Sequence, residues 1–161
     1  MNAIEMLTKQ HREMEASLKT ILEADGRARR PLFEKVADVL MSHVLVEEAL
    51  FYPAVKAKRT EDILLESLEE HLSLKRIVAD LLALSVADET FEAKLHVLKE
   101  QAEHHHEEEE EKLFPKVKKL LSAFELDALG ESMGEAQAKL LQGQPRNRAP
   151  GQTEAASSLR S

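Results

Sequence analysis

The chain has 161 residues, of which 32% are charged and only 4% aromatic, and its formal net charge is −8. It contains no cysteine, which excludes a disulfide framework and any thiolate metal site, and its acidic balance argues against nucleic acid as a partner. No apolar stretch has the length of a membrane span, and the N-terminus lacks the basic and apolar blocks of a signal peptide, so we expect a cytoplasmic protein.

Apolar residues recur at three- and four-residue steps along most of the chain, which predicts an all-α protein. Gly26 and the basic residues after it end the first helix, and Pro31 suits the first turn of the second. Thr60 is a plausible N-cap for the third helix. The expected helices cover about residues 2–25, 31 to beyond 50, 60–86, 88–122 and, as a short fifth helix, 126–141.

The last part of the chain differs in composition from the rest. After Gln142 it is rich in proline, glycine and serine. Such a segment buries too little apolar surface to offset the entropy lost on ordering. We therefore expect a bundle domain over residues 1–142 and a flexible tail over residues 143–161.

The first two helices resemble the next two in sequence. The segment that starts at His11 aligns with the one at His71, and the segment from His43 to Pro53 aligns with that from His105 to Pro115, at offsets of about 60 and 62 positions. The repeat predicts two helical hairpins related by a pseudo-twofold axis. A site at the centre of a four-helix bundle would be encoded in this way.

The repeat also aligns residues that can bind metal. A histidine and a glutamate four positions apart project from one face of the second helix and again from one face of the fourth. The first and third helices add one imidazole each. Imidazoles and carboxylates suit iron, manganese or zinc, and two facing carboxylates can bridge two cations. The candidate ligands are His11, His43, Glu47, His71, His105 and Glu109.

Each of these motifs alone is more typical of an exposed pair or an exposed histidine on a helix surface. The shared register argues for a common role, because independent surface histidines have no reason to occupy equivalent positions. His43 also lies within an apolar run, where an unpaired buried polar group costs on the order of 1–3 kcal/mol. A metal ion would compensate for that cost.

The pattern His-x3-Glu-Glu followed by Leu-Phe and Pro, present twice with one histidine on each preceding helix, resembles the hemerythrin HHE cation-binding family over about residues 1–141. The resemblance implies an up-down antiparallel four-helix bundle holding two iron ions, bridged by carboxylates and by oxo or hydroxo oxygen. The four histidines would be terminal ligands and the two glutamates bridging ligands. It further implies binding of, or reaction with, dioxygen, peroxide or nitric oxide, in redox sensing, iron handling or oxidative-stress defence.

The third helix departs from the pattern of oxygen-carrying hemerythrins, which supply two histidines four positions apart from it. Around His71 the corresponding residues are Ser67 and Lys75, neither of which suits iron. One metal would then lack a histidine, and a water, an open position or a carboxylate such as Glu70 would take its place. This favours sensing or redox chemistry over simple oxygen carriage, while carrier, sensor and enzyme all stay open.

On the fourth helix three ligand pairs fit the sequence. They are His105 with Glu109, His105 with Glu110, and His104 with Glu109, since family members also use a spacing of five.

Several other residues are expected to have no direct role. We expect Tyr52 to pack beside Pro53 rather than to bond to an oxygen species on the metal. Pro53 and Pro115 should kink their helices. The histidines expected to face solvent are His96, His104 and His106. The alternative for one of the last two, which flank the ligand face, is a contact with a metal ligand.

Other classes of protein fit this sequence less well. A ferritin-like site needs Glu-x-x-His on two helices, and one match occurs, from Glu103 to His106. The zinc-hydrolase motif His-Glu-x-x-His is absent from the sequence. A metal-independent helical interaction module explains the helices but not the repeated histidine register.

The chain ends in a run of small residues followed by Leu159 and Arg160. This run resembles the C-terminal docking peptides that load cargo, including hemerythrin-like cargo, into bacterial encapsulin shells. By that resemblance the protein would act inside such a compartment.

Overall fold

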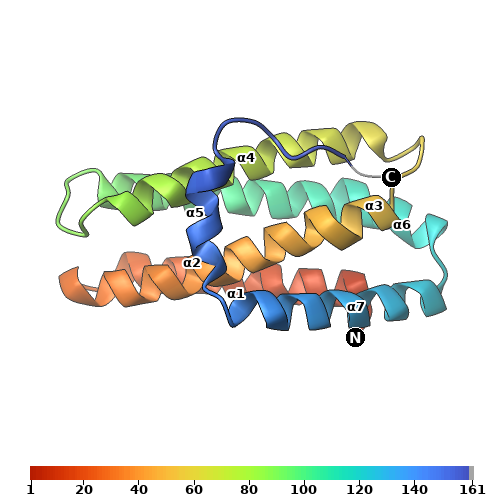
Figure 1. Cartoon of the computed structure of the whole chain (residues 1–161), viewed down its shortest axis with the longest axis horizontal. Helices are drawn as coiled ribbons and strands as arrows, with labels where there is room; N and C mark the ends of the chain where they lie inside the picture. The colour runs from red at the N-terminus through yellow and green to blue at the C-terminus, as the bar shows by residue number, and fades with distance from the viewer. Residues whose placement is uncertain (160–161) are drawn as a thin grey trace.

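The computed structural model describes residues 1–159, and this part is helical, without strands. Four rods run antiparallel in an up-down bundle, as expected (Figure 1). The two hairpins pair α1 (Ala3–Glu23) with α2 (Arg29–Val46) and α4 (Glu61–Ala83) with α5 (Phe91–Glu108). The bundle closes through contacts of α1 with α5 and of α2 with α4. Within the described part, no helix is both long and apolar enough to cross a membrane.

The second and fourth rods each continue through a π-helical turn into a short final helix. Each turn begins at a predicted ligand, Glu47 or Glu109, and leads into a proline, Pro53 or Pro115. Proline cannot donate the backbone hydrogen bond of a regular α-helix, and a π turn accommodates one extra residue. The interruption expected at the prolines therefore takes the form of a wider turn. These segments are η2 (Glu47–Phe51) with α3 (Tyr52–Ala54), and η3 (Glu109–Leu113) with α6 (Phe114–Leu120).

Local hydrogen bonds define where several helices begin. Asn2 and Glu5 form a capping box at the start of α1, which satisfies two backbone N–H groups that have no partner within the helix. Thr60 precedes α4 but does not cap it. Its hydroxyl donates to the carbonyl of Val55 (2.8 Å) and accepts from the N–H of Ala57 (2.9 Å), which closes the turn before α4.

Two apolar clusters fill the bundle, one toward each end. His11 lies one turn from Leu7 in one cluster and one turn from Met14 in the other. The other three predicted histidine ligands also lie between residues of the two clusters. Each fully buried leucine contributes roughly 1.5–3 kcal/mol by leaving water. The clusters therefore order the bundle on both sides of a central polar layer.

The fifth helix is longer than expected. α7 (Ala123–Leu141) has 19 residues, starts at a capping box formed by Ser122 and Glu125, and packs outside the four rods on α1 and α2. Gly130 permits this packing, because a Cβ there would lie 2.5 Å from the carbonyl oxygen of Met1.

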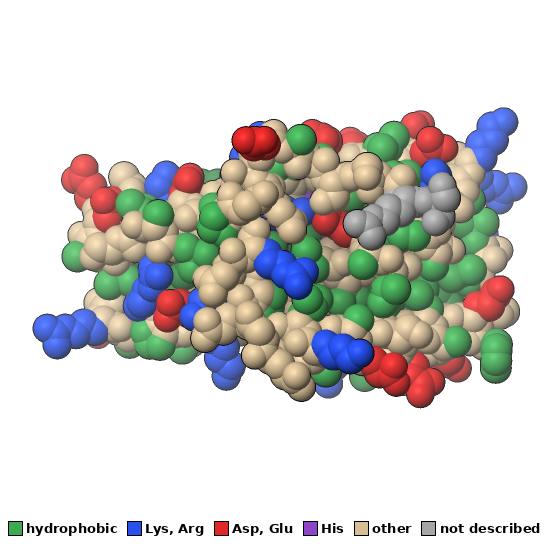
Figure 2. Space-filling model, viewed as in Figure 1, with side chains coloured by type: hydrophobic (Ala, Val, Ile, Leu, Met, Phe, Trp, Pro, Cys, Tyr) green, Lys and Arg blue, Asp and Glu red, His purple; other side chains and the backbone are tan. Residues whose placement is uncertain are grey.

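The expectation of a flexible tail is wrong for residues 143–159. The 3₁₀ helix η4 (Pro145–Gln152) crosses α2 and contacts α4, and Figure 2 shows this segment across the face of the bundle, beside exposed hydrophobic side chains. Ala149 is fully buried, and Arg146 pairs with Asp38 at 2.7 Å. A few anchored side chains thus order a polar segment. Arg160 and Ser161, the end of the predicted docking peptide, lie outside the described residues.

Candidate metal centre

The six residues expected to bind metal come together at mid-height in the bundle. Each has at most 2% of its surface exposed. They form two groups that share Glu47, and within each group one potential ligand atom per residue lies within 4.8 Å of all the others. The first group contains His11, His43, Glu47 and Glu109, and the second contains Glu47, His71 and His105.

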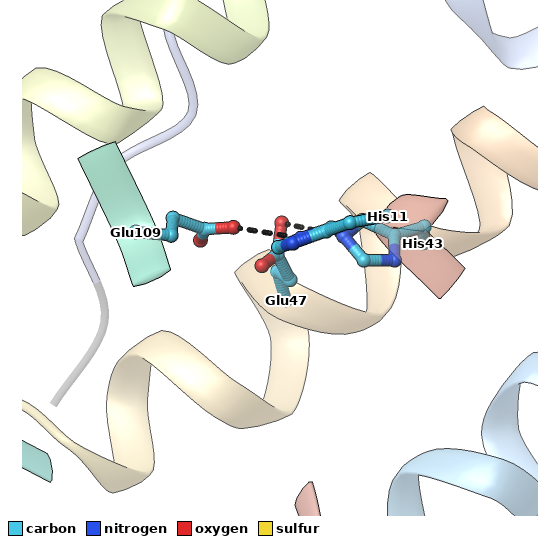
Figure 3. A group of neighbouring side chains, drawn as sticks. All are labelled: His11, His43, Glu47 and Glu109. Carbon is cyan, nitrogen blue, oxygen red and sulfur yellow. Dashed lines mark ion pairs between the residues drawn. The ribbon is translucent and has the colours of Figure 1, made fainter. Parts of the chain in front are cut away.

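The first group joins α1, α2 and both π turns. Figure 3 shows its four side chains pointing toward one another. The Nε2 atom of His11 lies 3.2 Å from Oε1 of Glu109, and Nε2 of His43 lies 3.5 Å from Oε1 of Glu47. Each imidazole therefore faces a carboxylate with the same ring nitrogen.

The second group joins α4 and α5 to the same two carboxylates. The Nε2 atoms of His71 and His105 are 3.1 Å apart, and Nε2 of His71 is 3.1 Å from Oε1 of Glu47. Nε2 of His105 also lies 3.6 Å from Oε1 of Glu109. Both glutamates thus lie between the two pairs of histidines.

The outer nitrogen of every histidine bonds to an oxygen on a second side chain. Carboxylate and amide oxygens only accept hydrogen bonds, so each Nδ1 must be the protonated donor. This leaves the Nε2 lone pair of each neutral ring directed to the centre, the tautomer that metal binding needs. The acceptors are Glu110 for His11 (2.8 Å), Gln10 for His43 (2.8 Å), Glu48 for His71 (2.8 Å) and Glu70 for His105 (2.7 Å).

Four buried atoms at the centre have no hydrogen-bond partner within residues 1–159. They are Nε2 of His11 and of His43, Oε2 of Glu47 and Oε1 of Glu109. Leaving such atoms unpaired costs roughly 1–3 kcal/mol each, and a cation between them would compensate all four. Nitrogen and oxygen donors of this kind suit iron, manganese or zinc.

The charges of the centre are strongly coupled. Burial raises the pKa of Glu47, and the negative charge of Glu109 raises it further. Burial disfavours a charged His105, but the charge of Glu109 and the hydrogen bonds to Glu47 and Glu70 together outweigh burial and hold the pKa of His105 well above its usual value. Burial and the charge of His11 hold the pKa of His43 well below its usual value. Without metal the centre therefore retains protons, which metal binding would release.

Tyr52 lies in the centre, whereas the sequence predicted simple packing beside Pro53. Its hydroxyl donates to Oε2 of Glu109 at 2.7 Å and lies 3.2 Å from Nε2 of His71. The ring also stacks on that of His71, with centroids 5.4 Å apart. The lone tyrosine thus brings an oxygen to the histidine pair that is short of a nitrogen ligand.

One residue at the position of the missing histidine, Lys75, has another contact, and so has Glu70, the carboxylate considered as a replacement. The Nζ atom of Lys75 lies 3.0 Å from Oε1 of Glu48. Glu70 is on the outer side, where its carboxylate accepts the bond from Nδ1 of His105.

On the fourth rod the structure brings His105 of α5 and Glu109 of η3 together. The side chain of His104 is 65% exposed, and the carboxylate of Glu110 lies behind His11. His96 is exposed, as expected.

The expectation that His106 faces solvent is wrong. Only 1% of its surface is exposed, its ring stacks on that of His11 at 3.9 Å, and its Nδ1 donates to Oε2 of Glu15 at 2.7 Å. One residue beyond His105, the helix has rotated by about 100°, which here points the side chain at α1 rather than at water. Sequence spacing within one helix carries no signal for this contact.

Comparison with known proteins agrees with this geometry. The sequence model of the hemerythrin HHE cation binding domain matches residues 2–117. The chain belongs to this family. No curated protein matches this hemerythrin-like chain.

A crystal structure of a hemerythrin HHE cation binding domain-containing protein from Mycobacterium kansasii superimposes with a TM-score of 0.79 at 24% sequence identity. The match covers 96% of this chain and 95% of that one, so the shared fold extends to α7 and the C-terminal segment.

Proposed function

We propose that this hemerythrin-like protein binds two iron ions and reacts with dioxygen, peroxide or nitric oxide. The supporting observation is the common orientation of four buried imidazoles. Every Nδ1 is held by an outer oxygen, every Nε2 is directed inward, and two buried carboxylates lie between the rings. A bundle held together only by packing has no need of this arrangement.

The two groups suggest how the ions would be held. His11 and His43 would bind the first ion, and His71 and His105 the second. Glu47 and Glu109 would bridge the two, and the oxygen of Tyr52 would face the second ion. These donors also suit manganese and zinc, so the identity of the metal is part of the proposal.

Iron would supply the redox chemistry, and the surrounding residues would control access. Glu48, which contacts His71, lines a cavity of about 540 Å³ between α2, α7 and the C-terminal segment. Ser157 also lines this cavity. A small ligand in this cavity would lie beside Glu48, on the outer side of His71, and none of the six central residues lines the cavity.

Metal content and the ultraviolet-visible spectrum of aerobically purified protein test the proposal. We expect about two irons per chain and the absorption of a bridged ferric pair, both lost in Glu47→Ala. Glu111→Ala is the matched control, because Glu111 is an exposed member of the same acidic run as Glu109. The control variant should keep its metal and its colour.

If the protein is expressed with iron, manganese and zinc all available and contains stoichiometric manganese or zinc, that metal would replace iron in the proposal. A protein that binds no metal even after anaerobic iron loading would refute it and favour the interaction module. A Glu111→Ala variant that lost metal as Glu47→Ala does would also contradict it, since binding would then reside in the acidic run.

The cytoplasmic location and the encapsulin shell stay predictions from the sequence. Docking of the tail would require Ser157 to leave Lys75, with which it shares a hydrogen bond of 3.2 Å. Deleting residues 157–161 should abolish co-purification with a shell, and unchanged loading would refute the docking.

A further inference from the structure

A pair of glutamine side chains connects α7 to the metal centre. Nε2 of Gln10 donates to Oε1 of Gln137 at 2.6 Å, and Nε2 of Gln137 donates back to Oε1 of Gln10 at 3.2 Å. The same Oε1 of Gln10 accepts the bond from Nδ1 of His43 at 2.8 Å. Gln137 is 8% exposed and lies outside the residues that match the family model.

The direction of these hydrogen bonds is set by the backbone. The hydroxyl of Ser42 donates to the carbonyl of Val39 at 2.8 Å, so its oxygen is left as an acceptor. That oxygen accepts from Nε2 of Gln137 at 3.1 Å, which orients the amide of Gln137. A flipped Gln10 would then place its NH₂ group against that of Gln137. Gln10 is therefore held with its oxygen toward His43.

The orientation matters because an amide, unlike a carboxylate, can present either a donor or an acceptor. A flipped Gln10 would donate to Nδ1 of His43, and the proton of the neutral ring would move to Nε2. That tautomer has no lone pair for a metal at the centre. The outer acceptors of the other three histidines are the carboxylates of Glu110, Glu48 and Glu70, which need no such control.

We propose that Gln137 is a positioning residue of the metal centre, which holds Gln10 and thereby fixes His43 as a ligand of the first ion. In this proposal α7 both packs on the outside of the bundle and orients a ligand of the metal centre. The role in metal retention rests on the proposed di-iron function. The two ions would differ in retention, because only the first depends on a neutral amide.

Release of iron to a chelator tests this role. Loss of an outer partner of a ligand costs about 10- to 100-fold in metal affinity, and Gln137 acts through such a partner, Gln10. In Gln137→Leu we therefore expect one of the two ions to leave up to about 10-fold faster than in the wild type and the other ion to leave at its wild-type rate. The double variant that combines Gln137→Leu with Gln10→Glu should restore slow release, because a carboxylate can only accept the hydrogen bond from Nδ1 of His43. Met133→Ala is the control, since Met133 is a fully buried, apolar residue of the same helix.

The tautomer of His43 gives a readout that needs no metal. Nitrogen-15 shifts of the metal-free protein at neutral pH should report Nδ1–H in the wild type and a mixture of tautomers in Gln137→Leu. Unchanged tautomer and release rate in Gln137→Leu would overturn the inference. So would equal acceleration by Met133→Ala, or a double variant that stays fast. A wild type without metal would refute the proposed function, and the nitrogen shifts alone would then decide the positioning role.

Discussion

Replacing Lys75 with methionine tests the charge pair next to the second histidine pair. Lys75 is 1% exposed, and its Nζ lies 3.0 Å from Oε1 of Glu48 and 3.2 Å from Oγ of Ser157. Methionine keeps most of the packing volume and removes the charge. Lys75→Met therefore tests the contribution of the ion pair while the core stays filled.

The expected loss in the free energy of unfolding can be worked out from the pKa of Glu48. Burial alone would raise its pKa, but the hydrogen bond from His71 and the charges of His71 and Lys75 lower it to about 2 from an ordinary value of 4.5. This difference corresponds to about 3 kcal/mol, shared between the two partners. We expect Lys75→Met to lower the free energy of unfolding by about 1–3 kcal/mol at pH 7, since His71 still holds the carboxylate.

The dependence on pH has a definite sign. The pKa of Glu48 is lower in the folded state than in the unfolded state, so its contribution is complete above about pH 4.5 and is lost as the pH falls toward 2. The difference in stability between wild type and Lys75→Met should shrink over that range.

Urea unfolding of the metal-free proteins at pH 7 and pH 3 measures this effect, because metal binding would add its own dependence on pH. Glu48→Gln is the control background, in which Lys75→Met should have little effect. A loss below about 0.5 kcal/mol at pH 7, or an equal loss at pH 3, would refute the reasoning.

Three further predictions concern packing and metal removal. Gly130→Ala should destabilise the protein by about 1–3 kcal/mol in urea unfolding, because its Cβ would meet backbone atoms, whereas Gly134→Ala, with nothing within 4 Å, should be neutral or stabilise it by up to about 1 kcal/mol. His106→Ala should cost about 2–3 kcal/mol by the same measurement and His104→Ala less than about 0.5; equal costs would contradict the burial of His106. Chelation should lower the melting temperature of the wild type by several degrees and leave Glu47→Ala unchanged, as calorimetry would show.

The helices and the six central residues were predictable from the sequence because their signals lie within single helices. Apolar spacing identifies the buried face of each rod, and the four-residue step from His43 to Glu47 places both on that face. The repeat then relates one hairpin to the other. The pair that the structure brings together, His105 of α5 with Glu109 of η3, was among the three considered.

The surroundings of the centre were decided by tertiary structure alone. Gln10 and Gln137 meet across two helices separated by more than a hundred residues, and Tyr52 reaches Glu109 from another rod. His106 lies only two residues beyond the exposed His104, and which helix its side chain faces depends on how the rods pack. Periodicity assigns a side chain to a face of its own helix, but the partner on that face is determined only when the helices assemble.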